Sequence, residues 1–332
     1  MNTTFQQAQF LLKKAVDKGC SDCHIHPFEN GAHVLFRMYG KLVHFCSLPL
    51  QHYQRIISHF KFLAGMNTGE RRIPQSGAFS NADWQYEFRL STIPTPNGES
   101  LVIRLLPQHV SVSFNELFVF SEQALFLKKL CQHEHGLIIV SGPTGSGKST
   151  TVYAMLKEMN RQSKRQIITI EDPIEQKVEP FVQMEVNNKA GMTFHEGLRS
   201  VLRHDPDVIF IGEIRDEETA KIAIRSSLTG HLVISTMHAA YAEQVVARFL
   251  EFGISMLDIK QTMLSIICQR LVFHPVYKRK AIVEYIQKND ITTLLEHPMK
   301  TTNNQPLSEW IELAEMKGWT ACAGLKKNEE SF

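Results

Sequence analysis

The residues best suited to chemistry form one short run, Gly142-Pro143-Thr144-Gly145-Ser146-Gly147-Lys148-Ser149-Thr150. Its spacing, G-x-x-x-x-G-K-S, is typical of a loop that binds nucleotide phosphates. Glycines let the backbone turn closely around a phosphate while successive N–H groups point inward at its oxygens. In such a loop Lys148 reaches the β- and γ-phosphates, and the Ser149 hydroxyl coordinates Mg²⁺. The run therefore predicts a site for a nucleoside triphosphate with Mg²⁺, although a glycine-rich turn that binds nothing is the alternative.

An acidic residue follows a second apolar run, where a phosphate-binding loop needs a carboxylate. Residues 207–213 read Asp-Val-Ile-Phe-Ile-Gly-Glu, so Glu213 comes at the carboxyl end of a predicted strand. Ligands of parallel sheets bind at this end of the strands. A glutamate there can orient the attacking water and accept its proton. We therefore predict Glu213 as the general base, with a solvated loop acid as the alternative.

A second acidic cluster follows the predicted strand over residues 167–170. It consists of Glu171, Asp172 and Glu175. Because parallel strands end beside one another, we expect this cluster near the glycine-rich loop, where it would position water or supply outer-sphere ligands of Mg²⁺. An acidic loop with a proline turn is the alternative.

Two histidines flank the predicted strand over residues 232–235. His231 precedes the strand and His238 follows it. His238 therefore falls at the carboxyl edge of the sheet, where it could sense a γ-phosphate. A single histidine is more often structural, so the residues alone leave its role open.

A parallel sheet is needed to bring these residues together. Short apolar strands alternate with helices in the second part of the chain, at residues 137–140, 167–170, 208–211 and 232–235. This alternation predicts a parallel sheet covered by helices. The first part has a mixed α+β pattern, with predicted helices over residues 5–18 and 51–65 and strands over residues 23–45, 85–93 and 100–106.

The change of pattern predicts how the chain divides. We expect an N-terminal α+β domain over residues 1–107, a linker over 108–119, a P-loop domain over 120–272 and a small, mostly helical C-terminal region over 273–332. At about 100–200 residues per domain, 332 residues agree with two main domains.

The composition excludes several classes of protein. Apolar residues make up 43% and charged residues 21%, which excludes a disordered or fibrous chain. With 36 Lys and Arg against 34 Asp and Glu, the formal charge is +2, so we expect no direct nucleic-acid binding. No apolar run approaches the roughly 18 residues needed to span a bilayer. Six cysteines do not indicate a disulfide framework in a chain of this length, so we expect a cytoplasmic protein.

Four sequence boxes in order resemble the secretion and type IV pilus ATPase superfamily. The glycine-rich loop is similar to its Walker A box, and its Asp box, atypical Walker B box and His box resemble residues 168–175, 202–220 and 229–239. This resemblance implies a RecA-like fold for the P-loop domain and a PAS-like fold for the N-terminal domain. It also implies that Glu171, Glu175, His231 and His238 belong to an ATPase site that binds ATP and Mg²⁺.

The first part of the chain resembles the same superfamily. SDCHIHP (residues 21–27), RIPQSGAF (72–79) and FRLSTIPTPNGESLVIRLLP (88–107) are similar to its motifs, and the last has the assembly or secretion form rather than the retraction form. In the family, arginines of this domain cross to the nucleotide of a neighbouring subunit, and Arg89 and Arg104 match them. Such an arginine can raise the rate by about 10³–10⁵. Ordinary surface arginines on a strand are the alternative.

Two departures narrow the resemblance. The long N-terminal extension of the large assembly ATPases has no counterpart, and neither does their tetracysteine zinc insert. At the insert the chain reads Cys268-Gln-Arg-Leu-Val-Phe-His, and one cysteine cannot build a tetrahedral site, so we expect no zinc. A short, zinc-free chain of this kind most resembles the ATPases of competence pseudopili.

The resemblance implies a motor that hydrolyses ATP to assemble a competence pseudopilus for DNA uptake. It implies a homo-oligomer, a hexamer, at the inner face of the cell membrane, with a polytopic inner-membrane platform protein as partner. A retraction or type II secretion motor on the same scaffold is one alternative, and a nucleotide-sensing scaffold with negligible turnover is another. The near-neutral charge argues against a DNA helicase.

Overall fold

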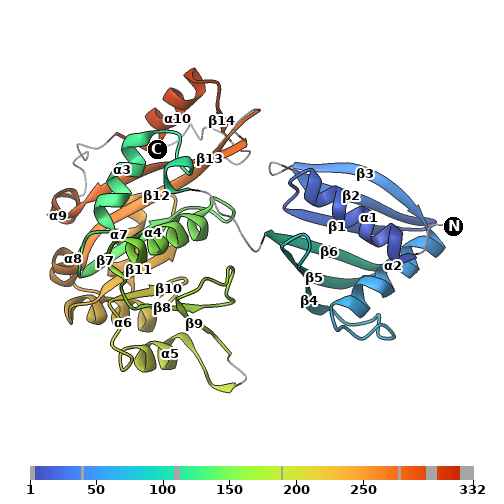
Figure 1. Cartoon of the computed structure of the whole chain (residues 1–332), viewed down its shortest axis with the longest axis horizontal. Coiled ribbons are helices and arrows are strands. Elements are labelled where there is room, and N and C mark those ends of the chain that lie inside the picture. Colours follow the sequence, from blue (N-terminus) through green and yellow to red (C-terminus); the bar gives the residue numbers. More distant parts are fainter. Residues whose placement is uncertain are drawn as a thin grey trace. The chain divides into compact units, whose positions relative to one another are not determined.

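The chain folds into two compact units in the computed structural model, which describes residues 4–38, 41–107, 113–187, 190–275, 278–296 and 305–321. One unit lies within Met1–Val110 and the other within Ser111–Ala321 (Figure 1). Among the described residues, no helix is long and apolar enough to cross a membrane.

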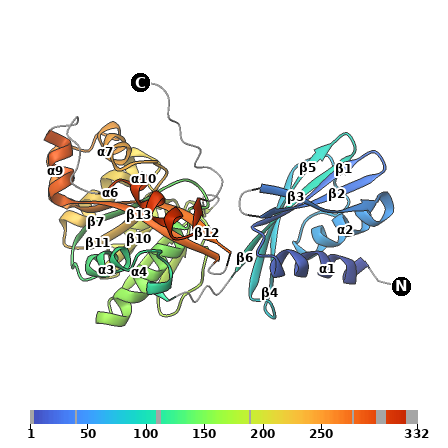
Figure 2. The same ribbon diagram turned by 90° about the horizontal axis from the view of Figure 1, so that it is seen from above.

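The first unit is an antiparallel sheet with two helices on one face. The strands are ordered β3-β2-β1-β6-β5-β4, and α1 and α2 lie side by side against the sheet (Figures 1 and 2). The bounds are α1 Thr4–Asp17, β1 Asp22–Phe28, β2 Gly31–Met38, β3 Lys41–Pro49, α2 Leu50–Leu63, β4 Gln75–Asn81, β5 Tyr86–Thr95 and β6 Gly98–Pro107. Since successive residues of a strand point to opposite faces, Cys23 and Ile25 enter the core under the helices, whereas Asp22 and His24 lie on the other face.

The second unit is built on a mostly parallel sheet. Strands β12-β7-β11-β10-β8-β9 are parallel in that order, β13 adds antiparallel to β12 at the edge, and the short β14 also pairs with β12. The bounds are β7 Gly136–Ser141, β8 Ile167–Glu171, β9 Val182–Glu185, β10 Val208–Ile211, β11 Leu232–Met237, β12 Met263–His274, β13 Lys278–Gln287 and β14 Thr320–Ala321.

Helices cover both faces of this sheet (Figure 2). Alternate residues of β7 enter two separate cores, with Leu137 and Ile139 in one and Ile138 and Val140 in the other. Burial on both faces explains why β10 and the middle of β7 are continuous apolar runs and why β11 begins as one. The helices are η1 Phe114–Glu116, α3 Ser121–Leu130, α4 Lys148–Ser163, α5 Phe194–Val201, α6 Glu217–Leu228, α7 Ala242–Glu251, α8 Met256–Thr262, α9 Lys288–Glu296 and α10 Leu307–Met316.

Two segments differ from the predicted division. Residues 273–332 do not start as a helical region, because residues 278–287 form strand β13 and complete the sheet before α9 and α10 follow. Within the predicted linker, Phe114 and Phe118 are buried in the core under α3 and α4, and the Val119 N–H donates to the Ala281 carbonyl. Residues 113–119 therefore belong to the second unit, and residues 108–112 lie outside the described residues.

Candidate nucleotide site

The glycine-rich loop joins the interior strand β7 to helix α4, as its sequence predicts. Gly142, Gly145 and Gly147 have φ angles of 148°, 78° and 83°, which residues with side chains rarely adopt. A Cβ on Gly142 would also lie 2.6 Å from the carbonyl oxygen of Gln269. Glycine is therefore required at the start of the loop by both conformation and space.

Two polar side chains of the loop suit a bound phosphate. Lys148 is buried, and its Nζ donates to the carbonyl oxygens of Gly142 at 2.8 Å and Pro143 at 3.1 Å, which holds the ammonium across the loop. The Ser146 hydroxyl is buried without a hydrogen-bond partner among the described residues. A buried hydroxyl left in this way costs about 1–3 kcal/mol, which a phosphate oxygen would offset. Of the other predicted ligands, Ser149 and Thr150 open α4 and Thr144 is exposed in the loop.

Glu213 and His238 meet at the same edge of the sheet. Glu213 follows β10 and His238 follows β11, and Glu213 Oε1 lies 3.2 Å from His238 Nε2. Glu213 Oε2 accepts from Arg215 Nε at 2.8 Å. Burial and then the Lys148 cation hold the pKa of His238 below its usual value, so the ring is neutral near pH 7. A neutral ring can donate its Nε2–H to the carboxylate, and this orients Glu213.

The charges of Lys148, Glu213 and Glu175 act on one another. Burial lowers the pKa of Lys148, and the carboxylates of Glu213 and Glu175 oppose that shift. The two acids therefore lie within electrostatic reach of the ammonium. Asp172 and Glu175 are both exposed on the segment after β8, where solvent and a hydrated metal ion can reach them.

Glu171 has a different environment from the other acids. It ends β8 and is only 3% exposed. The Tyr153 hydroxyl donates to its Oε2 at 2.5 Å, the Thr169 hydroxyl donates to its Oε1 at 2.6 Å, and Gln183 Nε2 lies 3.3 Å from Oε1. Burial raises the pKa of this carboxyl against those hydrogen bonds. Its carboxylate joins α4, β8 and β9, so the geometry favours a positioning role.

His231 is not brought to this edge. It precedes β11 and His238 follows the strand, so the two histidines lie at opposite ends, roughly 23 Å apart at about 3.3 Å per residue. His231 Nδ1 lies 3.0 Å from the Ser226 carbonyl oxygen and 3.1 Å from the Thr229 hydroxyl. Within its own unit His231 therefore fastens the end of α6 and does not face the glycine-rich loop.

Arg89 and Arg104 belong to the first unit. They are directly opposite each other on β5 and β6, on the sheet face away from α1 and α2. Arg104 Nε donates to Asp22 Oδ1 at 3.0 Å, and Arg89 Nε donates to Glu87 Oε1 at 2.7 Å. The register makes the two arginines a cross-strand pair, and each guanidinium group donates to a carboxylate of its own unit. Their role toward a neighbouring nucleotide stays a prediction.

Cysteine, histidine and carboxylate side chains are the protein groups that most often bind metal ions. In the part of the chain that the structure describes, no group of three or more His, Cys, Asp or Glu side chains could hold a metal ion. Cys20 and Cys23 are buried free thiols, and burial raises the pKa of Cys20 to about 11. The Ser149 hydroxyl at the start of α4 and the exposed Asp172 carboxylate are oxygen donors of the kind that Mg²⁺ prefers, so both stay predicted ligands.

Sequence reasoning missed several residues that support the site. Tyr153 and Gln183 hold Glu171, Arg215 holds Glu213, and Gln269 lies beneath the loop. Only Gln269 had a usable signal, because together with Arg270 it interrupts a run of mostly apolar residues. Its importance depends on the pairing of β12 with β7, which the local sequence does not specify.

Comparison with known proteins agrees with this geometry. Residues 5–323 match the family described as Type II/IV secretion system protein. The chain is 43% identical over 274 residues to the competence protein ComGA of Bacillus subtilis (strain 168), covering 82% of this chain and 77% of that protein. It is 41% identical over 265 residues to the type II secretion system ATPase E of Vibrio cholerae serotype O1, covering 79% of this chain and 52% of the relative. The chain thus spans about half the length of that second relative.

A solved structure supports the fold over nearly the whole chain. The crystal structure of the pilus retraction motor PilT with bound ADP matches with a TM-score of 0.70 and 28% identity, covering 94% of this chain and 93% of that one. The predicted superfamily and the predicted combination of an α+β domain with a P-loop domain are confirmed. The chain belongs to the type II/IV secretion system protein family and is an ATPase of the secretion and pilus type.

Proposed function

We propose that this chain is the ATP-hydrolysing motor that assembles a competence pseudopilus and so serves DNA uptake. The observation that carries the proposal is the meeting of Lys148, Glu213 and His238 at one sheet edge in a chain that is 43% identical to a competence protein. The proposal has a broad form, an ATP-driven assembly or secretion motor. Its more specific form, the role in competence, rests on that identity over 82% of the chain.

The proposed chemistry uses the side chains in distinct ways. ATP is the substrate, with its β- and γ-phosphates held by the N–H groups of the loop and by Lys148. Glu213 orients the attacking water and accepts its proton, and the neutral His238 ring holds the carboxylate in place. Mg²⁺, held by the Ser149 hydroxyl, would neutralise phosphate charge when bound.

The proposed assembly is a homo-oligomeric ring, a hexamer, at the inner face of the cell membrane. Arg89 and Arg104 would reach the nucleotide of a neighbouring subunit and stabilise the charge that develops during phosphoryl transfer. Contacts made in one nucleotide state and lost in another would change the angle between the two domains. A polytopic inner-membrane platform protein would convert that motion into extrusion of pilin subunits.

The test is complementation of a deletion strain, scored by transformation frequency and by ATP hydrolysis of the purified protein. We expect Lys148→Ala to abolish both, because no other ammonium group lies in the loop. Lys157→Ala is the matched control, since Lys157 lies on the same helix and outside the loop. A Lys148→Ala protein that hydrolyses ATP as fast as the wild type would refute the assigned site.

A type II secretion motor is the second candidate, favoured by the 41% identity to the Vibrio cholerae ATPase. Normal transformation with impaired protein export in the deletion strain would support it. A pilus retraction motor predicts excess fibres in the deletion strain, whereas an assembly motor predicts their loss. A nucleotide-sensing scaffold predicts that Glu213→Gln, which keeps nucleotide binding and loses hydrolysis, still supports transformation.

A further inference from the structure

Strand β12 places a buried glutamine directly beneath the glycine-rich loop. Gln269 is only 1% exposed. Its Nε2 donates to the Ser146 carbonyl oxygen at 2.7 Å, and its Oε1 accepts from the Thr151 hydroxyl at 2.8 Å. Ser146 belongs to the loop and Thr151 to the first turn of α4. One side chain therefore joins the loop to the helix that follows it.

The glycines of the loop make the space that this glutamine occupies. A Cβ on Gly142 would lie 2.6 Å from the Gln269 carbonyl oxygen, and a Cβ on Gly147 would lie 3.0 Å from Gln269 Nε2. Gln269 thus packs against the first and the last glycine of the motif. A Cβ at Gly142 would force the Gln269 backbone to shift, and a Cβ at Gly147 would press on the Gln269 amide.

The next residue, Arg270, holds the backbone of Gln269. Arg270 is buried, and its Nη1 donates to the Gln269 carbonyl oxygen at 3.0 Å. Its Nη2 donates to the Ala240 carbonyl oxygen at 3.1 Å, two residues after His238. Arg270 therefore links the backbone of Gln269 to the segment that follows β11 and contains His238.

We propose that Gln269 is a positioning residue of the nucleotide site, a role that rests on the proposed ATP binding. A trans peptide is planar, with its C=O and the following N–H pointing in opposite directions. Since Gln269 holds the Ser146 carbonyl from below, the N–H of Gly147 must point away from Gln269 and into the loop. The glutamine fixes the direction of one phosphate-binding N–H group without touching the phosphate.

Gln269→Glu separates this role from simple packing. Glutamate keeps the size and still accepts from Thr151, but it places a carboxylate oxygen where Ser146 needs a donor. We expect the affinity for ADP, measured by calorimetry, to fall about ten- to a hundredfold. Thr151→Val removes only the other hydrogen bond, so we expect a change of less than about threefold.

Gln123→Glu is the matched control. Gln123 is also fully buried, and it also makes both kinds of hydrogen bond, since its Nε2 donates to the Val283 carbonyl at 2.8 Å and its Oε1 accepts from the Val283 N–H at 3.3 Å. It lies on α3, outside the loop. We expect both glutamate variants to lower the melting temperature and only Gln269→Glu to lower the affinity for ADP.

The possible results distinguish the positioning role of Gln269 from the proposed function. Equal ADP affinity of Gln269→Glu and Gln123→Glu would overturn the positioning role and leave the proposed function intact. A wild-type protein that binds no adenine nucleotide would overturn both. If Gln269→Glu does not fold, Gln269→Met replaces it, because methionine fills the space without a donor or a charge; wild-type affinity in that variant would likewise overturn the role.

Discussion

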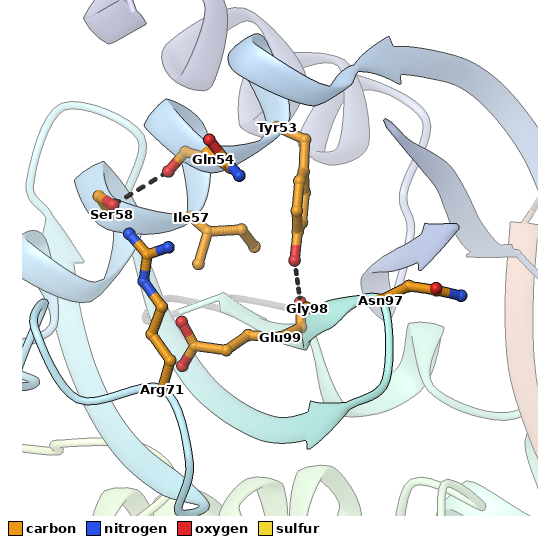
Figure 3. Close-up of a pocket in the computed structure, with 8 residues that line it drawn as sticks. All are labelled: Tyr53, Gln54, Ile57, Ser58, Arg71, Asn97, Gly98 and Glu99. Atoms are coloured by element: carbon orange, nitrogen blue, oxygen red, sulfur yellow. Dashed lines mark hydrogen bonds between the residues drawn. The ribbon is translucent and has the colours of Figure 1, made fainter. Parts of the chain in front are cut away.

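A buried ion pair in the first unit makes a strong prediction about stability. Lys61 of α2 is fully buried, and its Nζ donates to Glu99 Oε1 at 2.6 Å and to the Glu70 carbonyl oxygen at 2.6 Å. Figure 3 shows the Glu99 carboxylate beneath α2, beside Arg71, with the Tyr53 hydroxyl donating to the Glu99 carbonyl oxygen at 2.8 Å. The pair therefore joins helix α2 to the start of β6.

Lys61→Met leaves the Glu99 carboxylate buried without its counter-ion. Breaking a buried pair in this way costs about 3–5 kcal/mol, whereas replacing both partners is often close to neutral. We therefore expect Lys61→Met to destabilise the first unit by this amount and Lys61→Met with Glu99→Gln to recover most of it. Arg72→Met is the surface control, because the Arg72 side chain is 88% exposed in its pair with Glu70 and should change little.

Hydrogen exchange of the full chain, read by mass spectrometry on peptides, is the assay. Since each 1.4 kcal/mol is a factor of ten, exchange in β1 and β6 should become about 10²- to 4 × 10³-fold faster in Lys61→Met. Peptides of β7 and β11 belong to the other unit and serve as an internal reference. Exchange within threefold of the wild type, or a double variant as unstable as the single one, would refute this account of the pair.

Three further experiments test the site. Tyr153→Phe removes a hydrogen bond to the buried Glu171 carboxylate and should cost about 1.5–3 kcal/mol, which an unchanged urea midpoint would contradict. Arg104→Gln and Glu213→Gln subunits, each inactive alone, should recover ATP hydrolysis when mixed; activity no higher than the mean of the two would exclude an arginine supplied by a neighbour. The pKa of His238 is lowered on folding, so the folded protein favours the neutral ring. This contribution to stability is complete above about pH 6.5, and it is lost as the pH falls below that value. The urea midpoint of the wild type relative to His238→Gln should therefore drop between pH 7.5 and 5.5, and a constant difference would contradict the shift.

The loop could be predicted because all its requirements are local. An apolar strand, glycines at fixed spacing and an amphipathic helix follow one another, and the structure has β7, the loop and α4 in those places. Glu213 and His238 were also predictable, since each follows an apolar strand and parallel strands end at a common edge. The same rule applied to His231 places it at the far end of β11, where the structure has it; only its resemblance to a motif had assigned it to the site.

The hairpin of β12 and β13 was harder to predict, because polar residues of β12 form hydrogen bonds with segments that are distant in the sequence. Gln269 and Arg270 interrupt the apolar pattern of β12, since they face the loop and the segment after β11 rather than an apolar core. Their hydrogen bonds span 123 and 30 residues of sequence. A periodic pattern reports burial against neighbours of any kind, and it does not report which segment supplies a hydrogen-bond partner.

Burial separates the roles of the acids at the carboxyl edge. Glu171 is 3% exposed, and its carboxylate already accepts hydrogen bonds from the hydroxyl groups of Tyr153 and Thr169 and lies near the Gln183 amide. Taking a proton from water would require breaking these hydrogen bonds. The Glu213 side chain is 16% exposed and is held by one neutral ring and one exposed guanidinium group, which leaves it accessible to water. A general base must reach the proton that it abstracts. The geometry therefore favours Glu213 as the base, with Glu171 fixing the helix that carries Lys148 through Tyr153.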